Sequence, residues 1–190
     1  MIDVAVRIRG LRPLLMHSPK GMYDVKTMAT KKPGKGVEYS PEEEAELAAY
    51  RTADGVLCVK ESHILGCLER SAATVRLARS RASAAQTIKA TIMIDPQEIP
   101  LTWEGKKLKD FEVDIQRAVV PPRRGSGVLR ARPLIRNWEA EFHMKYNPDF
   151  GLPPNDVIEI LKRGGQYFGI LDWRPRYGIF TVSESTVSEE

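Results

Sequence analysis

Cysteine is scarce in this chain, whose 190 residues include only Cys58 and Cys67. Two cysteines make neither a disulfide framework nor a zinc-ligand pattern. We therefore expect both to be small core residues of a protein in a reducing compartment. No apolar run approaches the roughly 20 residues that a membrane helix needs. The sequence predicts a cytoplasmic protein without a membrane partner.

The sequence also lacks the motifs of common nucleotide-using and hydrolytic enzymes, because it has neither a phosphate-binding glycine loop nor a nucleophile elbow. Asp110, Glu112 and Asp114 alternate along a predicted strand, and a solvated strand face explains them better than magnesium ligation. The pair Gly164-Gly165 follows a predicted helix, whereas a dinucleotide fingerprint opens one. We expect no metal and no cofactor.

What the chain does have is segregated charge. Its net charge is only +4, but residues 116–136 contain six arginines and no acidic residue. Much of the negative charge lies elsewhere, in residues 42–46 and at the C-terminus. A separate positive region is the electrostatic pattern expected for a polyanionic partner such as nucleic acid.

The arginines of this region lie on a predicted hairpin, with strands over 111–120 and 128–135 and a Pro/Arg/Gly-rich turn over 121–127. Arg130 and Arg132 would share one strand face, because side chains alternate along a strand. They would extend the positive charge of the turn down the strand, which favours a nucleic-acid role over a merely solvated loop. The candidate binding residues of the hairpin are Arg117, Arg123, Arg124, Arg130 and Arg132.

A second arginine-rich segment lies near the C-terminus, around Trp173 to Tyr177. If the segment is extended, Arg174 and Arg176 point one way and the two aromatic rings the other. Arginine grips phosphate with a planar fork, and aromatic rings stack on unpaired bases. Arg174, Arg176 and Tyr177 are therefore candidates for nucleic-acid binding, with Trp173 in the core. Alternatively, the aromatic residues are all core, or the arginines meet a buried carboxylate such as Asp172.

Periodicity and turn residues predict the remaining elements. The Lys/Gly/Pro-rich segment 18–40 has little to bury, so we expect a mobile insertion there, and its Lys31 and Lys32 are further candidates for nucleic-acid binding. Ser40 is a suitable N-cap for a helix over 41–50. The other predictions are a strand over 3–9, a helix over 61–79, a loop over 81–90, strands over 91–94, 99–101 and 138–146, a helix over 154–163 that stops at Gly164, a strand over 179–182 and a disordered acidic tail over 183–190.

Without the insertion and the extra hairpins, this order of elements is βαββαβ. That order predicts an α+β, ferredoxin-like domain over 1–182, with the topology of the RNA-recognition motif. Such sheets often present one face to single-stranded RNA. The sequence lacks the aromatic-rich consensus of that motif, so we do not expect bases to stack on the sheet.

Three segments together resemble the RAMP superfamily of CRISPR-associated proteins, and most of all its crRNA-binding backbone subunits. They are Leu11–His17 after the first strand, Gly55–Leu68 where a strand leads into a helix, and the glycine- and arginine-containing loop Gly169–Phe180. The pattern is similar to that of phage and prophage proteins of the same architecture. The resemblance implies RNA binding, with copies of the chain arranged along the RNA strand. The loop is less glycine-rich than in the processing nucleases of the superfamily.

The leading hypothesis is a non-catalytic protein that binds single-stranded nucleic acid, RNA rather than DNA. The second is a metal-independent endoribonuclease in which His17 acts as general acid or base. His63 and His143 are expected to be structural. The third is a phage structural or interaction protein whose arginines bind an acidic protein partner.

Overall fold

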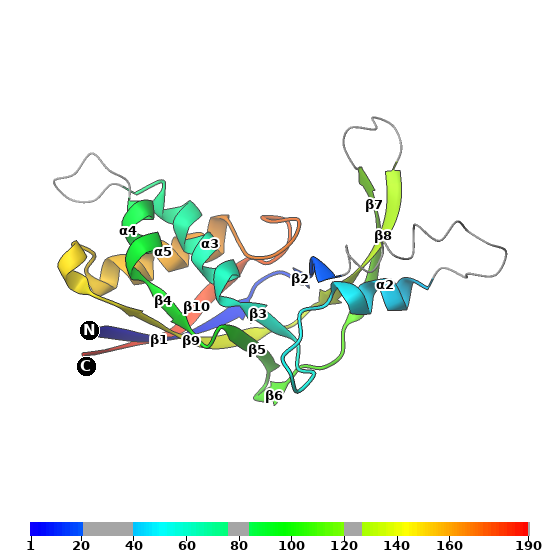
Figure 1. Ribbon diagram of the computed structural model, residues 1–190, viewed down its shortest axis with the longest axis horizontal. Helices are drawn as coiled ribbons and strands as arrows, with labels where there is room; N and C mark the ends of the chain where they lie inside the picture. The colour runs from blue at the N-terminus through cyan, green and yellow to red at the C-terminus, as the bar shows by residue number, and fades with distance from the viewer. Residues whose placement is uncertain (21–39, 76–83, 120–126, 190) are drawn as a thin grey trace.

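A seven-stranded antiparallel sheet forms the larger part of the molecule in the computed structural model, which describes residues 1–20, 40–75, 84–119 and 127–189 (Figure 1). Its neighbouring strands, in order, are β10 (Phe180–Glu189), β1 (Ile2–Gly10), β9 (Glu139–Tyr146), β5 (Glu98–Trp103) and β3 (Cys58–Lys60). Two short strands flank this path: β4 (Met93–Asp95) pairs with β9, and β6 (Lys106–Lys107) pairs with β5.

Three helices cover one face of this sheet: α3 (Glu61–Ala72), α4 (Ala84–Thr91) and α5 (Pro154–Tyr167) (Figure 1). The chain passes from β1 through α3 to β4 and β5, then to β9, through α5, and ends in β10. Because β9 lies between β1 and β5, the first βαβ unit is split in the ferredoxin-like way. The predicted α+β, ferredoxin-like fold is confirmed.

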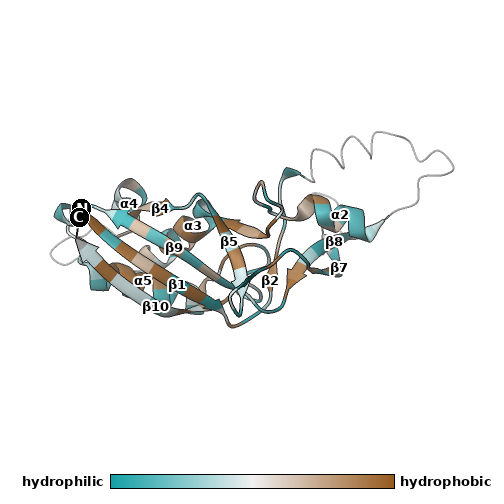
Figure 2. Cartoon of the chain, turned by 90° about the horizontal axis from the view of Figure 1, so that it is seen from below, coloured by the Kyte–Doolittle hydropathy of each residue, from teal (hydrophilic) through white to brown (hydrophobic). Residues whose placement is uncertain are grey.

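The two faces of the sheet differ as the alternation of side chains requires. Val4, Val6 and Ile8 of β1 are buried with Phe142 and Met144 of β9 in the core. Figure 2 shows hydrophobic and hydrophilic residues alternating along these strands. The opposite face carries the cross-strand ion pairs Arg7–Glu141 and Arg9–Glu139 and a contact between His143 and Asp3.

Helix α5 does not stop at Gly164, as we expected, but runs through Gly164 and Gly165 to Tyr167. The two glycines let the helix approach its neighbours closely. A Cβ atom on Gly164 would lie 3.0 Å from Sγ of Cys67 in α3, and one on Gly165 would lie 2.6 Å from ring atoms of Phe180 in β10. The prediction was wrong because packing, rather than helix termination, requires these glycines.

Other boundaries also differ from expectation. Helix α3 ends at Ala72 rather than near residue 79, and α4 occupies part of the segment 81–90 that we expected to be a loop. The tail after residue 182 is not disordered up to Glu189, because β10 continues to that residue and pairs with β1 along the strand. Backbone pairing with β1 needs no apolar side chains, so the polar composition of the tail gave no sign of it.

A smaller three-stranded sheet projects from this body, with β8 (Gly127–Ile135) between β2 (Leu14–Leu15) and β7 (Glu112–Val119) (Figure 1). Helix α2 (Pro41–Ala48) lies beside β8, where the Glu44 carboxylate accepts a 3.1 Å hydrogen bond from the backbone N–H of Ala131. The predicted N-cap is confirmed, because the Ser40 hydroxyl accepts from the backbone N–H of Glu43.

A short 3₁₀ turn, η1 (Pro148–Phe150), precedes α5. Both cysteines are buried and free, as expected for core residues, and burial raises the pKa of the Cys67 thiol to about 12. Within the described ranges, no helix is both long and apolar enough to cross a membrane. The expected insertion falls largely on residues 21–39, outside the described residues, together with Lys31 and Lys32.

Candidate nucleic-acid interface

The loop between α5 and β10, residues 168–179, closes on itself and on the N-terminal segment. The backbone N–H of Ile170 donates to the carbonyl of Gly178, and the N–H of Gly178 donates to the carbonyl of Pro13. Gly178 has φ +70°, and a Cβ atom there would overlap the carbonyl oxygen of Ile170. Glycine is therefore required where the two ends of the loop meet, and we name residues 168–179 the C-terminal loop.

The segment from Trp173 to Tyr177 is a turn rather than an extended strand. The backbone N–H groups of Arg176 and Tyr177 both donate to the carbonyl of Trp173. The rings of Trp173 and Tyr177 lie side by side, with centroids 6.3 Å apart. Tyr177 is half-buried and its hydroxyl accepts a 3.0 Å hydrogen bond from the Gln116 side chain in β7. The turn thus joins the C-terminal loop to the β7–β8 hairpin.

Arg132 does not belong to an exposed binding stripe, so that prediction was wrong. Its side chain is only 6% exposed, with Nε 3.2 Å from Oδ2 of Asp172. Its guanidinium carbon lies 5.2 Å from the centroid of the Trp173 ring. Arg130 and Arg132 do share one strand face, as predicted, but at Arg132 that face packs against the C-terminal loop. Arg130, on the same face, is two-thirds buried and pairs with Glu44 at 3.0 Å.

Asp172 connects three parts of the chain. Besides Arg132, it meets Nδ1 of His17, which lies 3.5 Å from Oδ2, and its backbone N–H donates to the carbonyl of Leu15. Burial alone would raise the pKa of Asp172. The hydrogen bond from His17, the charge of Arg132 and the N–H of Trp173 outweigh burial and hold that pKa below its ordinary value. The carboxylate is therefore ionised at neutral pH.

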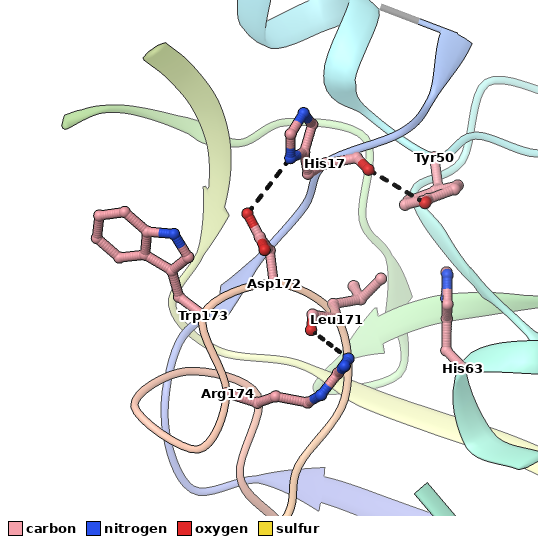
Figure 3. A pocket seen from close by; sticks show the side chains of 7 residues that line it. All are labelled: His17, Tyr50, His63, Leu171, Asp172, Trp173 and Arg174. Carbon is pink, nitrogen blue, oxygen red and sulfur yellow. Dashed lines mark hydrogen bonds and ion pairs between the residues drawn. The ribbon is translucent and has the colours of Figure 1, made fainter. Parts of the chain in front are cut away.

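A pocket of about 330 Å³ lies beside Asp172. Its lining comes from His17, Tyr50, His63 and residues 171–174 (Figure 3). The Tyr50 hydroxyl donates to the backbone carbonyl of His17, and the Tyr50 ring meets the His63 ring edge-on, with centroids 4.8 Å apart. Burial, with smaller contributions from the charges of Lys60 and Arg174, lowers the pKa of His63 to about 4. His63 is therefore uncharged at neutral pH.

The sequence did not point to Tyr50 or His63 as members of a site. His63 was expected to be structural, and it does have a structural role, because its Nδ1 accepts a 3.1 Å hydrogen bond from the backbone N–H of Lys60 at the start of α3. The pocket joins residues from four separate segments. No local motif carries that information.

Ten of the twelve arginines in the described part of the chain fall into two groups. Six of them form ion pairs with carboxylates: Arg7, Arg9, Arg51, Arg130, Arg132 and Arg136. By contrast, Arg12, Arg70, Arg174 and Arg176 have no carboxylate partner among the described residues, and all four surround the C-terminal loop. Arg174 donates to the Leu171 carbonyl, Arg12 to the Arg176 carbonyl and Arg70 to the Gly169 carbonyl.

The structure thus brings Arg174, Arg176 and Tyr177 together in one loop, as the sequence suggested, and adds Arg12 and Arg70 to them. Asp172, considered as a partner for Arg174 and Arg176, is instead paired with Arg132 and His17. Arg117 is exposed on β7. Arg123 and Arg124 lie outside the described residues, so their role stays a prediction.

The acidic residues of β7 are placed as a solvated strand face would place them. Glu112 pairs with Arg136, and Asp114 accepts a hydrogen bond from Gln116. In the described part of the chain, no three His, Cys, Asp or Glu side chains are grouped so that they could hold a metal ion.

Comparison with solved structures finds a similar fold in a chain of the type III-B Cmr-beta complex bound to cognate target RNA. The TM-score is 0.56 and the sequence identity 13%. The similarity covers 99% of this chain but 61% of the other, so this chain spans less than two thirds of its length. No protein-family model and no curated protein matches the chain. The likeness shows that the two chains share a fold, which here is the predicted α+β, ferredoxin-like one.

Proposed function

We propose that this protein is a non-catalytic binder of single-stranded RNA, and that the C-terminal loop is its main contact surface. The observation that carries the proposal is the gathering of arginines without carboxylate partners around this loop. Elsewhere in the described chain, most arginines are neutralised by Asp or Glu. Four positive charges left unpaired around one loop would repel one another, and a phosphate backbone would relieve that repulsion.

The polar and aromatic groups of the loop suit a single strand better than a duplex. Arg174 and Arg176 are exposed and available for phosphate. The half-exposed rings of Trp173 and Tyr177 offer faces on which unpaired bases can stack. The hairpin arginines Arg117, Arg123 and Arg124 would extend this surface.

RNA is preferred over DNA in this proposal because the fold resembles that of a chain in an RNA-bound complex. We also propose that several copies of the chain lie side by side along one strand, as the resemblance in the sequence implies.

A binding titration tests the proposal. Single- and double-stranded RNA and DNA of about 20 nucleotides would be titrated at two salt concentrations. We expect the tightest binding to single-stranded RNA, with an affinity that falls steeply as salt rises, because phosphate contacts release counterions. Absence of binding to every nucleic acid at low salt would refute the proposal and favour an interaction protein with an acidic protein partner.

A second candidate function is metal-independent cleavage of RNA, and the position of His17 favours it. The imidazole lies in the pocket with Nδ1 3.5 Å from the Asp172 carboxylate. A carboxylate in that position can orient a histidine so that Nε2 is free for proton transfer. Incubation of RNA with the protein in EDTA separates the two functions. Specific cleavage that disappears in a His17→Ala variant would establish the second and reject the first.

A further inference from the structure

The pocket beside Asp172 differs chemically from the arginine surface that surrounds it. Its volume, about 330 Å³, is at the lower end of the range for small-molecule sites. Figure 3 shows Tyr50 and His63 on one side, Trp173 and Asp172 on the other, and Leu171 with Arg174 between them. A pocket that combines the rings of Tyr50, His63 and Trp173 with polar groups suits a flat heterocycle better than a phosphate alone.

The aromatic wall is uncharged. His63 is neutral at neutral pH, and its Nδ1 is occupied by the backbone N–H of Lys60, so its proton is on Nε2. Tyr50 is tied to the His17 carbonyl through its hydroxyl. These hydrogen bonds fix both rings in place before any ligand arrives, which lowers the ordering cost of binding.

The two carboxylate oxygens of Asp172 have different surroundings. Both Arg132 and His17 contact Oδ2, and that oxygen is buried. The side chain as a whole is still 28% exposed. Oδ1 is therefore the carboxylate oxygen left to face the pocket, where it can accept a hydrogen bond but repels an anion.

The charges set the orientation of a ligand. Asp172 keeps a phosphate away from the inner side of the pocket, whereas the exposed guanidinium of Arg174 attracts one at its rim. A nucleotide would thus enter with its base inward and its phosphate beside Arg174. Because the rim is part of the C-terminal loop, that phosphate can belong to a strand bound on the arginine surface.

We infer that the pocket receives one unpaired base of the bound strand, and that Asp172 selects a base carrying an exocyclic amino group at the position of cytosine N4 or adenine N6. Carboxylates accept hydrogen bonds from such amino groups. Uracil has a carbonyl oxygen at that position, which would face the carboxylate unfavourably. The inference rests on the proposed function, since it names the part of the strand that this site reads.

A titration of the protein tests the inference. The ligands are cytidine monophosphate, uridine monophosphate and ribose 5-phosphate, and binding is monitored through the amide NMR signals of residues 171–174. Cytosine carries an amino group where uracil carries a carbonyl oxygen, and its N3 accepts a hydrogen bond where that of uracil donates one. We expect cytidine monophosphate to bind at least about tenfold more tightly than uridine monophosphate, as one hydrogen bond to a charged group allows. Equal affinities for the three compounds, or no change in these signals, would overturn it.

Asp172→Asn provides the second measurement, because an amide offers both a donor and an acceptor to the base. It should bring the two nucleotides to nearly equal affinity, and a preserved preference for cytidine would count against the inference. Should the variant not fold, the comparison in the wild-type protein decides alone. If RNA binds as proposed but no mononucleotide binds in the pocket, only this inference fails. If no nucleic acid binds, the proposed function fails, whatever the mononucleotides do.

Discussion

The guanidinium of Arg132 meets the Asp172 carboxylate at 3.2 Å and packs 5.2 Å from the centre of the Trp173 ring. This contact fastens the β7–β8 hairpin to the C-terminal loop. Nε and Nη1 of Arg132 are buried without a well-aligned hydrogen bond to any described residue, so the short contact with Asp172 pairs the charges in poor hydrogen-bond geometry. The position of the loop therefore depends on a buried positive charge.

We predict that Arg132→Ala strongly destabilises the protein, because it leaves the Asp172 carboxylate half-buried without its arginine partner. Removing one member of a buried pair costs on the order of 3 kcal/mol in free energy of unfolding, which urea denaturation would measure. Arg136→Ala is the matched control, directly after the end of the same strand, since its pair with Glu112 is exposed on both sides and should matter little. Equal, small effects of both changes would contradict the fastening role.

We predict that replacing Arg174 and Arg176 together by Ala weakens binding of single-stranded RNA without unfolding the protein. The slope of log affinity against log salt should flatten by up to about two, one for each lost phosphate contact. Exposed substitutions of this kind usually change stability by less than about 0.5 kcal/mol. Fluorescence anisotropy at several salt concentrations measures the slope.

Arg163→Ala is the control for that experiment. Arg163 is exposed on α5, outside the C-terminal loop, and has no carboxylate partner among the described residues. It removes the same charge from another surface, so affinity should change little. If Arg163→Ala weakened RNA binding as much as Arg174→Ala or Arg176→Ala alone, the affinity would depend only on the net charge.

His63 should make the stability of the protein depend on pH. Its pKa is about 4 in the folded state, against about 6.5 when unfolded, so the unfolded chain binds a proton more readily. The stability from neutral His63 is complete above pH 6.5 and is lost as pH falls from 6.5 to 4. The loss at pH 5 would be about 2 kcal/mol at most.

His63→Gln removes the titrating ring while its side-chain oxygen can still accept from the N–H of Lys60. Urea denaturation at pH 7 and pH 5 should show a smaller loss of stability for this variant than for the wild-type protein. The difference isolates His63 from the contributions of His17 and His143, which are present in both proteins. Identical losses would mean that His63 is not protected from protonation by burial.

We predict that Gly165→Ala destabilises the protein even though alanine is the better helix former. The added Cβ would lie 2.6 Å from the ring and carbonyl of Phe180, forcing α5 away from β10. Overpacking of this kind costs roughly 1–3 kcal/mol. Thermal or urea denaturation would measure it.

Gly66→Ala in α3 is the matched control, because the nearest atom to its added Cβ is the flexible end of Arg70, at 3.3 Å. This change should be neutral or stabilising by up to about 1 kcal/mol. If both substitutions stabilised the protein, the close approach of α5 to β10 would not be a constraint.

Much of the fold could be read from local patterns. The alternation of Val4, Val6 and Ile8 gave the central strand, and Ser40 gave the start of α2. The order of strands and helices then left the split βαβ arrangement as the simplest sheet. The predictions that failed concern residues whose role is set by a distant neighbour, such as Gly165 against Phe180.

By itself, the sequence determined the ferredoxin-like order of elements, the two arginine-rich segments and the absence of recognisable enzyme motifs, because each of these depends on residues close together in the chain. Only the tertiary structure decided which arginines are neutralised. Arg132 and Arg174 look alike in the sequence, but β8 packs against the C-terminal loop and buries the first with Asp172, while the second stays exposed. An ion pair depends on distance in space. The fold brought Asp172 to Arg132 and His17, and with them formed the pocket.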